Sequence, residues 1–190
     1  QRDLKRMLAY SGIAQMGYVA IGLATFDGKA FEGILVFLAG YLATNVAAFL
    51  AGAALSNGEK EPHPLADLAG LGRRRPFAAT VLTLAMLSLT GLPPTVGFIG
   101  KLLVFRAAVD AGLITLALVG IFGSLVSAGY YLRVVYYLWM KEPSREVAAA
   151  EEDVLSGAAY ILVSAAMLVL GVLPRPLLDM ARAAVQSLPG

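Results

Sequence analysis

The chain has 190 residues, of which 58% are hydrophobic and 15% are charged, and its mean hydropathy is +0.73. Soluble domains contain about 45–50% apolar and about 25% charged residues, so this composition favours a membrane protein. The chain has no cysteine, which excludes disulfides, thiolate zinc sites and cysteine-ligated iron–sulfur clusters within it. A net charge of +2, with the basic residues at the ends of apolar segments, argues against nucleic-acid binding.

The first half of the chain contains two long apolar segments. Apolar stretches of about 20 residues, bounded by charged or turn-forming residues, predict helices that cross a bilayer core of about 30 Å. Met7 to Phe26 and Ile34 to Leu55 are two such stretches, joined by a short polar turn. Residues 56–64 are polar and interrupt the pattern, and 65–75 are expected to form a short interfacial segment that ends in three arginines.

The third apolar region, Phe77 to Ala111, is too long for one straight span, and it contains the adjacent prolines Pro93 and Pro94. Each proline removes a backbone donor and blocks the carbonyl one turn before it, so a helix must break there. We therefore predict one span that is interrupted at Pro93-Pro94. Its two halves are expected to follow each other through the membrane.

Leu113 to Met140 and Leu155 to Leu173 are the fourth and fifth predicted spans, with a solvated acidic loop from 142 to 153 between them. The predicted fold is all-α, a polytopic transmembrane bundle of five spans that occupies residues 1–176. Residues 177–190 are predicted to be a short amphipathic tail that lies along the membrane surface.

Lysine and arginine are distributed unequally between the two sides of these spans, and this bias predicts orientation. The segments on one side carry nine, and the segments on the other carry three. We expect the amino end to be cytoplasmic and the carboxyl end periplasmic. The two sets are Arg2, Lys5, Arg6, Lys60, Arg73, Arg74, Arg75, Lys141 and Arg145 against Lys29, Arg175 and Arg182.

Lys101 is the residue most suggestive of function, because it lies inside the interrupted span. The nine residues that separate it from Asp110 correspond to about 14 Å of helix, which places it near mid-membrane. A lysine at this depth costs about 2.5–3.5 kcal/mol on insertion scales, and intramembrane charges are usually functional. Desolvation disfavours the charged form, so we predict a proton-relay role for Lys101. The alternative is a lysine that snorkels or pairs with a fixed carboxylate.

The helix break is expected to expose backbone carbonyls that need partners, and water is the natural one. Gly97 and Gly100 either leave room for such water beside Lys101 or allow close helix packing, and the sequence favours neither interpretation. Both glycines and both prolines belong to the predicted helix-break site.

Polar residues recur at helical spacing on three of the predicted spans and are expected to face the protein interior. Each alone is best interpreted as an interhelical hydrogen-bonding residue, whereas together they are predicted to line a hydrated proton path. Arg133 has an equal alternative, which is snorkelling towards the interface near Lys141. His63 is expected to be solvated in a loop. The path candidates are Gln15, Tyr41, Thr44, Asn45, Tyr130 and Arg133, within stripes that also include Ser11, Tyr18, Ser127 and Tyr137.

Two motifs resemble a known family. The stretch Asp3 to Ser11, continuing through Gln15-Met16-Gly17-Tyr18, resembles the opening of a conserved span in the antiporter-like subunits of respiratory complex I, the NADH-quinone oxidoreductase. The run from Leu92 to Lys101 is similar to the broken helix of the same family. The resemblance implies the last five of fourteen spans of an N-type subunit, since M-type relatives place a glutamate at the position of Lys101. A start at Gln1 without methionine suggests a fragment.

This resemblance implies that Lys101 is a protonatable group of an H⁺-translocating NADH:ubiquinone or menaquinone reductase in the bacterial inner membrane. NAD, FMN, iron–sulfur clusters and quinone are implied in partner subunits, with no cofactor or metal in this chain. The implied partners are other membrane-arm subunits, the missing amino-terminal half and lipid. Related subunits often place histidines where Gln15 and Tyr41 stand, so a relay there would need water. A multi-subunit cation/proton antiporter and a purely structural membrane module are the alternatives.

Overall fold

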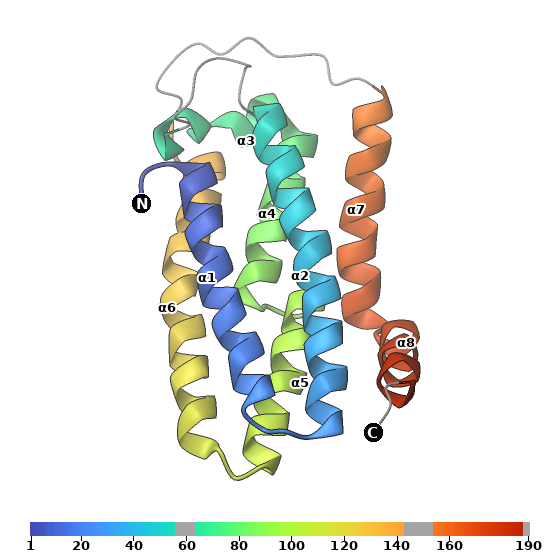
Figure 1. Ribbon diagram of the computed structural model, residues 1–190. Coiled ribbons are helices and arrows are strands. Elements are labelled where there is room, and N and C mark those ends of the chain that lie inside the picture. The colour runs from blue at the N-terminus through green and yellow to red at the C-terminus, as the bar shows by residue number, and fades with distance from the viewer. Residues whose placement is uncertain (56–63, 143–153, 188–190) are drawn as a thin grey trace.

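A computed structural model describes residues 1–55, 64–142 and 154–187. Within these ranges the chain is entirely helical, as predicted, apart from turns and an isolated β-bridge between Asp3 and Pro64. Figure 1 shows long helices packed side by side, with α8 lying across the end of α7. The elements are α1 (Leu4–Leu23), α2 (Gly28–Leu55), the 3₁₀ turn η1 (Leu65–Leu68), α3 (Leu71–Arg74), α4 (Pro76–Thr90), α5 (Val96–Asp110), α6 (Ile114–Trp139), α7 (Val154–Val172) and α8 (Arg175–Gln186).

Among the described residues, two helices are each long and apolar enough to cross a membrane, α2 and α6. The pair α7 and α8, bent by 77°, passes the same test when its members are taken together, which gives up to three candidate spans. α4 and α5 have 15 residues each, or about 22 Å of helix, and neither alone matches a core of about 30 Å.

Several helices begin earlier than predicted, because their polar first turns belong to the helix. α1 starts at Leu4, where the Asp3 carboxylate accepts a hydrogen bond from the Arg6 N–H at 2.7 Å. α2 starts at Gly28 rather than Ile34, and α8 starts at Arg175 rather than at residue 177. Proline is tolerated in the first turn of a helix, so Pro176 does not prevent α8 from starting there. Residues 143–153 of the predicted loop 142–153, and Lys60, His63 and Arg145, lie outside the described residues.

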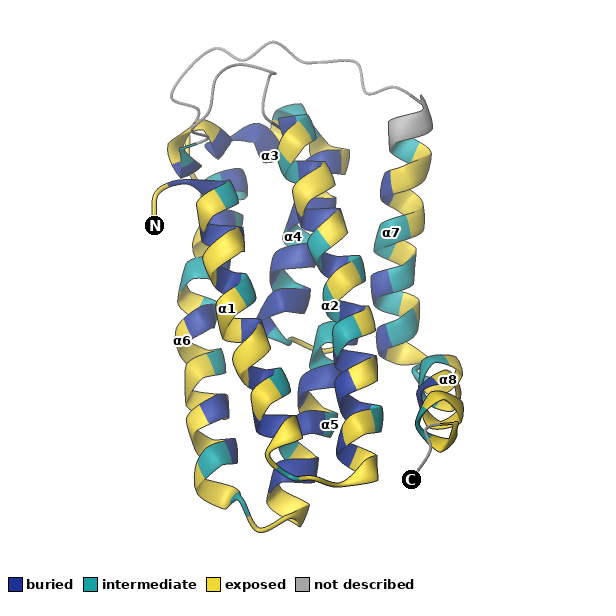
Figure 2. Cartoon of the chain, viewed as in Figure 1, coloured by how far each residue is buried: buried dark blue, intermediate teal, exposed yellow. Residues whose placement is uncertain are grey.

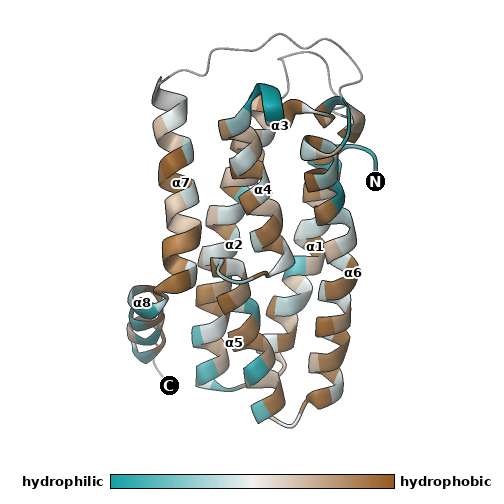
Figure 3. Ribbon diagram, turned by 180° about the vertical axis from the view of Figure 1, so that it is seen from behind, coloured by the Kyte–Doolittle hydropathy of each residue, from teal (hydrophilic) through white to brown (hydrophobic). Residues whose placement is uncertain are grey.

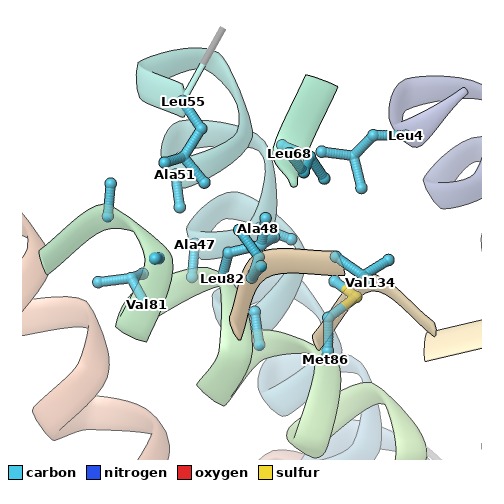
Figure 4. Packing of buried hydrophobic residues seen from close by; sticks show 14 of the residues in the cluster. Leu4, Ala47, Ala48, Ala51, Leu55, Leu68, Val81, Leu82, Met86 and Val134 are labelled. Carbon is cyan, nitrogen blue, oxygen red and sulfur yellow. The ribbon is translucent and has the colours of Figure 1, made fainter. Parts of the chain in front are cut away.

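The interior is divided into two apolar clusters along the bundle axis. The first, which we call the amino-end cluster, joins the start of α1 and the end of α2 to α4, the end of α6 and η1 (Figure 4). The second, the turn-end cluster, lies towards the α1–α2 and α5–α6 turns and consists of Tyr18, Ile21, Ile34, Phe37, Val104, Ala108 and Ala117. Buried residues face inwards in both halves, while the outward faces of the helices are largely apolar (Figures 2 and 3).

α4 and α5 follow each other along the bundle axis, with residues 91–95 between them (Figure 1). The Pro93–Pro94 peptide bond is cis. The other helices pack around this break. α2 contacts both α4 and α5, and Gly171 of α7 lies against the backbone of Pro94 and Thr95. The helix ends that flank the break, Thr90 and Val96, are therefore buried near the junction of the two apolar clusters, while Leu92, Pro93 and Pro94 between them are exposed.

Candidate functional site: a buried lysine at a helix break

The site begins with the way α4 ends. Gly91 adopts a left-handed backbone with φ of 86°, a conformation that glycine tolerates best and that commonly stops a helix. The N–H groups of Gly91 and Leu92 donate to the Leu87 carbonyl, each at 3.1 Å, and Gly91 also donates to the Ser88 carbonyl at 3.0 Å. The last four carbonyls of a helix lack partners within the helix, so the Leu89 and Thr90 carbonyls remain to be satisfied.

Lys101 satisfies both of them. Its Nζ donates to the Leu89 carbonyl at 2.7 Å, to the Thr90 carbonyl at 3.1 Å and to Ser124 Oγ on α6 at 3.0 Å. The side chain is buried, with 5% of its surface exposed, and the three N–H donors of an ammonium are all used. The predicted burial of Lys101 is therefore confirmed. The expectation that water satisfies the freed carbonyls is wrong for Leu89 and Thr90, because Lys101 takes that place.

The charge of this lysine is balanced by dipoles. Among the described residues no carboxylate forms an ion pair with Lys101, and the ion pairs of Arg106 and Arg182 lie elsewhere. The carbonyl end of α4 carries partial negative charge, which favours a cation. Nζ also lies 4.8 Å from the centroid of the Tyr18 ring, within range of a cation–π interaction. The alternative of a fixed acidic partner has no support in these parts of the chain.

A second buried side chain uses the same carbonyl. Gln15 Nε2 donates to the Leu89 carbonyl at 3.3 Å and to the hydroxyl of Tyr131 at 3.1 Å. Gln15 has 2% of its surface exposed, and Tyr131 has none. The Leu89 carbonyl thus links Lys101 to a polar pair that extends from α1 to α6. Of the predicted path residues, Gln15 is the one that shares a hydrogen-bonding partner with Lys101.

Gly97 and Gly100 allow close helix packing, which was one of the two interpretations of these residues. A Cβ on Gly97 would collide with the backbone of Ser88, and a Cβ on Gly100 would lie 2.7 Å from the Cα of Phe37. The Gly97 N–H donates to Ser88 Oγ at 3.3 Å. At both positions neighbouring helices fill the space, so neither glycine leaves room for water.

The predicted polar residues of α2 form a separate group. Thr44 is buried, and its hydroxyl lies 2.9 Å from Ser88 Oγ on α4. Asn45 Nδ2 donates to the Tyr41 hydroxyl at 3.2 Å. The Asn45 Oδ1 atom is buried without a hydrogen-bonding partner in the described part of the chain. In the parts of the chain that the structure describes, no hydrogen bond joins Tyr41, Thr44 or Asn45 to Lys101, so these residues lie near the break but do not contact the amine.

On α6 Arg133 is exposed in this chain, a position that agrees with the second of its two predicted roles, snorkelling towards the interface. Its guanidinium lies 5.7 Å from the ring centroid of Tyr137. The buried stripe of α6 consists of Ser127, Tyr131, Val134 and Leu138, which recur at helical spacing. Arg133 is one residue out of phase with Val134, so it points away from this stripe. Tyr130 is partly buried and packs against Tyr131 with ring centroids 4.5 Å apart.

Sequence reasoning missed the partners of the lysine. Ser124 lies one helical turn before Ser127, and this spacing was the available signal for it. The carbonyl partners had no signal in side-chain patterns. In the described ranges, no group of three or more His, Cys, Asp or Glu residues is placed to hold a metal ion. Chemically, the arrangement holds one protonatable amine in an apolar interior.

Comparisons with known proteins agree with this architecture. The family model described as "NADH:quinone oxidoreductase/Mrp antiporter, TM" matches residues 1–127. The chain is 45% identical over 184 residues to NADH-quinone oxidoreductase subunit N of Geobacter metallireducens, which covers 96% of this chain and 39% of that protein. The chain therefore spans about two fifths of the length of this relative.

Solved structures show the same fold. A chain of respiratory complex I from Thermus thermophilus with bound aureothin is 36% identical, with a TM-score of 0.76 over 94% of this chain and 40% of that one. A chain of the Mrp complex from Dietzia sp. is 22% identical, with a TM-score of 0.86 over 99% of this chain and 43% of that one, and shows a likeness of fold alone. This chain belongs to the NADH:quinone oxidoreductase/Mrp antiporter family of integral membrane proteins.

Proposed function

We propose that this chain is the carboxyl-terminal part of an antiporter-like, N-type subunit in the membrane arm of a bacterial NADH-quinone oxidoreductase, and that it relays protons through Lys101. The observation that carries the proposal is the Lys101 amine, which is buried at a helix break and held by carbonyls rather than by a carboxylate. An amine without a carboxylate counter-ion is able to lose its proton without leaving a buried carboxylate whose charge is uncompensated.

The proposed topology has five spans. α4 and α5 together provide about 45 Å of helix, enough to form one interrupted span across a core of about 30 Å. α1 and α7 complete the set with α2 and α6, so that residues 1–176 form the transmembrane bundle. Residues 177–190 form an interfacial tail, a role supported by the 77° bend between α7 and α8. The amino end lies in the cytoplasm and the carboxyl end in the periplasm.

In this mechanism Lys101 exchanges protons with a site in the amino-terminal half of the subunit and with the periplasmic side. Redox chemistry in distant subunits, which hold NAD, FMN, iron–sulfur clusters and quinone, supplies the driving force. Gln15 contributes through the carbonyl that it shares with Lys101. Water is needed beside Gln15, because an amide does not titrate near neutral pH. We assign the remaining path residues, Tyr41, Thr44, Asn45, Tyr130 and Arg133, to the wider polar surroundings of the break.

Purification of the full-length subunit in mild detergent tests the assembly. We expect other membrane-arm subunits to co-purify, and the reconstituted complex to acidify or alkalinise vesicles when NADH is added. Lys101→Met gives an unbranched side chain of similar length that has no protonatable nitrogen, and it should abolish this pH change. Lys29→Met, at an exposed lysine at the start of α2, is the matched control and should leave it intact.

Two other functions have distinct signatures. The fold shared with the Mrp complex chain supports a cation/proton antiporter subunit, for which sodium-dependent transport would continue without NADH. A structural membrane module would keep full transport in Lys101→Met while its assembly weakened. Either result would replace the proposed role of Lys101 in NADH-driven proton translocation.

A further inference from the structure

Ser124 is the least buried of the hydrogen-bonding partners of Lys101, and it is the one that comes from a third helix. Its Oγ accepts from Lys101 Nζ at 3.0 Å and lies 3.3 Å from the Thr90 carbonyl, to which it donates. Lys101 Nζ, Ser124 Oγ and the Thr90 carbonyl thus form a closed triangle, in which Nζ donates to Thr90 at 3.1 Å. The proposed function does not by itself explain why a hydroxyl is placed here.

The protonated state satisfies every donor in this group. An ammonium has three N–H donors and no acceptor, and they go to the carbonyls of Leu89 and Thr90 and to Ser124 Oγ. The Ser124 O–H uses the second lone pair of the Thr90 carbonyl. A buried donor left without an acceptor carries a desolvation penalty, so this complete pairing stabilises the charged amine.

The neutral state requires one change. A neutral amine has two N–H donors and one lone pair, so the two carbonyls can keep their bonds while the Ser124 contact must reverse. A hydroxyl donates as readily as it accepts, and rotation of the Ser124 O–H from the Thr90 carbonyl to Nζ satisfies the lone pair. The carbonyls cannot make this reversal, because they only accept.

We infer that Ser124 is a positioning residue for proton exchange, which holds the Lys101 nitrogen in one place in both of its protonation states. This inference rests on the proposed function of Lys101. Tyr18, the other group that faces the amine, presents its ring face to Nζ, which attracts a cation, while its hydroxyl contacts Ser124 and Ser127 rather than the amine. Among the contacts found in the described residues, Ser124 is therefore the group that can reverse its hydrogen bond with Nζ.

The backbone at this position of α6 is fixed, while the space beside it is open. The Ser127 hydroxyl donates to the Ser124 carbonyl at 2.7 Å, one turn further along the helix. No atom lies within 4 Å of a Cβ built on the neighbouring residue, Gly123, which is exposed. Ser124 itself is partly buried, so two substitutions of equal size are needed to separate the effect of the hydroxyl from that of a larger side chain.

The test compares Ser124→Thr with Ser124→Val in the assembled complex that contains the full-length subunit. Threonine and valine have nearly the same shape, and only threonine keeps the hydroxyl. We expect Ser124→Thr to keep most of the rate of NADH-driven proton translocation, and Ser124→Val to lower this rate about tenfold, which corresponds to one charged hydrogen bond. Thr25→Val, which removes a partly buried hydroxyl in the α1–α2 turn that does not touch Lys101, should stay near the unmodified value.

Equal translocation rates for the threonine and valine variants, whether both high or both low, would overturn the inference, since the hydroxyl would then not matter. Lys101→Met in the same assay separates this outcome from a failure of the proposed function. If Lys101→Met still translocates protons, the proposed function is wrong. If Lys101→Met is inactive while the two Ser124 variants agree with each other, only the inference about Ser124 is wrong.

Discussion

The helix break around Lys101 and the outward face of α6 around Arg133 each carry a basic residue on an apolar helix, but the two residues differ in burial and in contacts. Lys101 is 5% exposed and contacts two backbone carbonyls, a hydroxyl and an aromatic ring. Arg133 is exposed and has the ring of Tyr137 beside it. An interrupted helix can thus hold a buried cation with its own freed carbonyls, whereas Arg133 on the uninterrupted α6 points outwards.

The largest expected difference between these two regions is in the stability that each loses when a glycine is replaced by alanine. At the break, Gly97→Ala would push a methyl group into the Ser88 backbone and should lower the free energy of unfolding by about 3 kcal/mol. On the outward face, Gly123→Ala has open space and should be neutral or should stabilise the helix by up to about 1 kcal/mol. Denaturant unfolding of the two variants in detergent measures both effects. Equal losses would mean that the break is not tightly packed.

Two glycines with left-handed backbone allow a second comparison. Gly91 at the break has φ of 86° and Gly112 at the α5–α6 turn has φ of 78°, so alanine at either position should cost about 1–2 kcal/mol of stability. A Cβ on Gly91 would also lie 2.9 Å from Lys101 Cδ, while a Cβ on Gly112 would meet nothing within 4 Å. We expect only Gly91→Ala to reduce NADH-driven proton translocation. A similar reduction in Gly112→Ala would mean that the loss of translocation does not come from contact with Lys101.

The polar pair beside the break should have a smaller effect. Gln15→Met keeps the volume of the side chain but removes the hydrogen bond that Gln15 donates to the buried Tyr131 hydroxyl, and we expect a loss of about 1 kcal/mol. Tyr131→Phe removes the other partner, so the double variant should lose less than the sum of the single losses. Thermal unfolding of the four proteins measures this coupling. Strict additivity would show that the hydrogen bond contributes nothing to stability.

Arg133 should show the smallest effect of all. Because its side chain is exposed in this chain, Arg133→Gln should change the free energy of unfolding by less than about 0.5 kcal/mol. Proton translocation should also remain close to that of the unmodified complex. A severe loss of translocation with normal assembly would return Arg133 to the proton path, in agreement with the original interpretation of its polar stripe.

Much of the fold followed from sequence because apolar length and proline are strong local signals. The all-helical structure was predicted correctly, and α4 ends and α5 begins on either side of Pro93 and Pro94 as expected. The early start of α2 was missed because Lys29 and Glu32 look like loop residues, although a helix tolerates charges at its exposed end.

The site was predicted less completely. Lys101 was identified, because a lysine deep in an apolar segment is unusual whatever surrounds it. Its partners at Leu89 and Thr90 were not, since they are backbone carbonyls and depend on how the chain turns at Gly91. The two predicted roles of Arg133 could not be separated from sequence, because polar spacing defines a stripe but does not say which of two adjacent stripes is buried.

The most direct test of the central claim is to measure protons translocated per NADH oxidised in complexes that carry Lys101→Met or Arg133→Met in the full-length subunit. Both substitutions remove a basic group and leave an unbranched apolar side chain, so they differ mainly in the region that they probe. We predict that Lys101→Met loses at least about nine tenths of the translocation, a tenfold effect, while Arg133→Met stays within about twofold of the unmodified complex. Full translocation in assembled Lys101→Met, or equal losses in the two variants, would contradict the account.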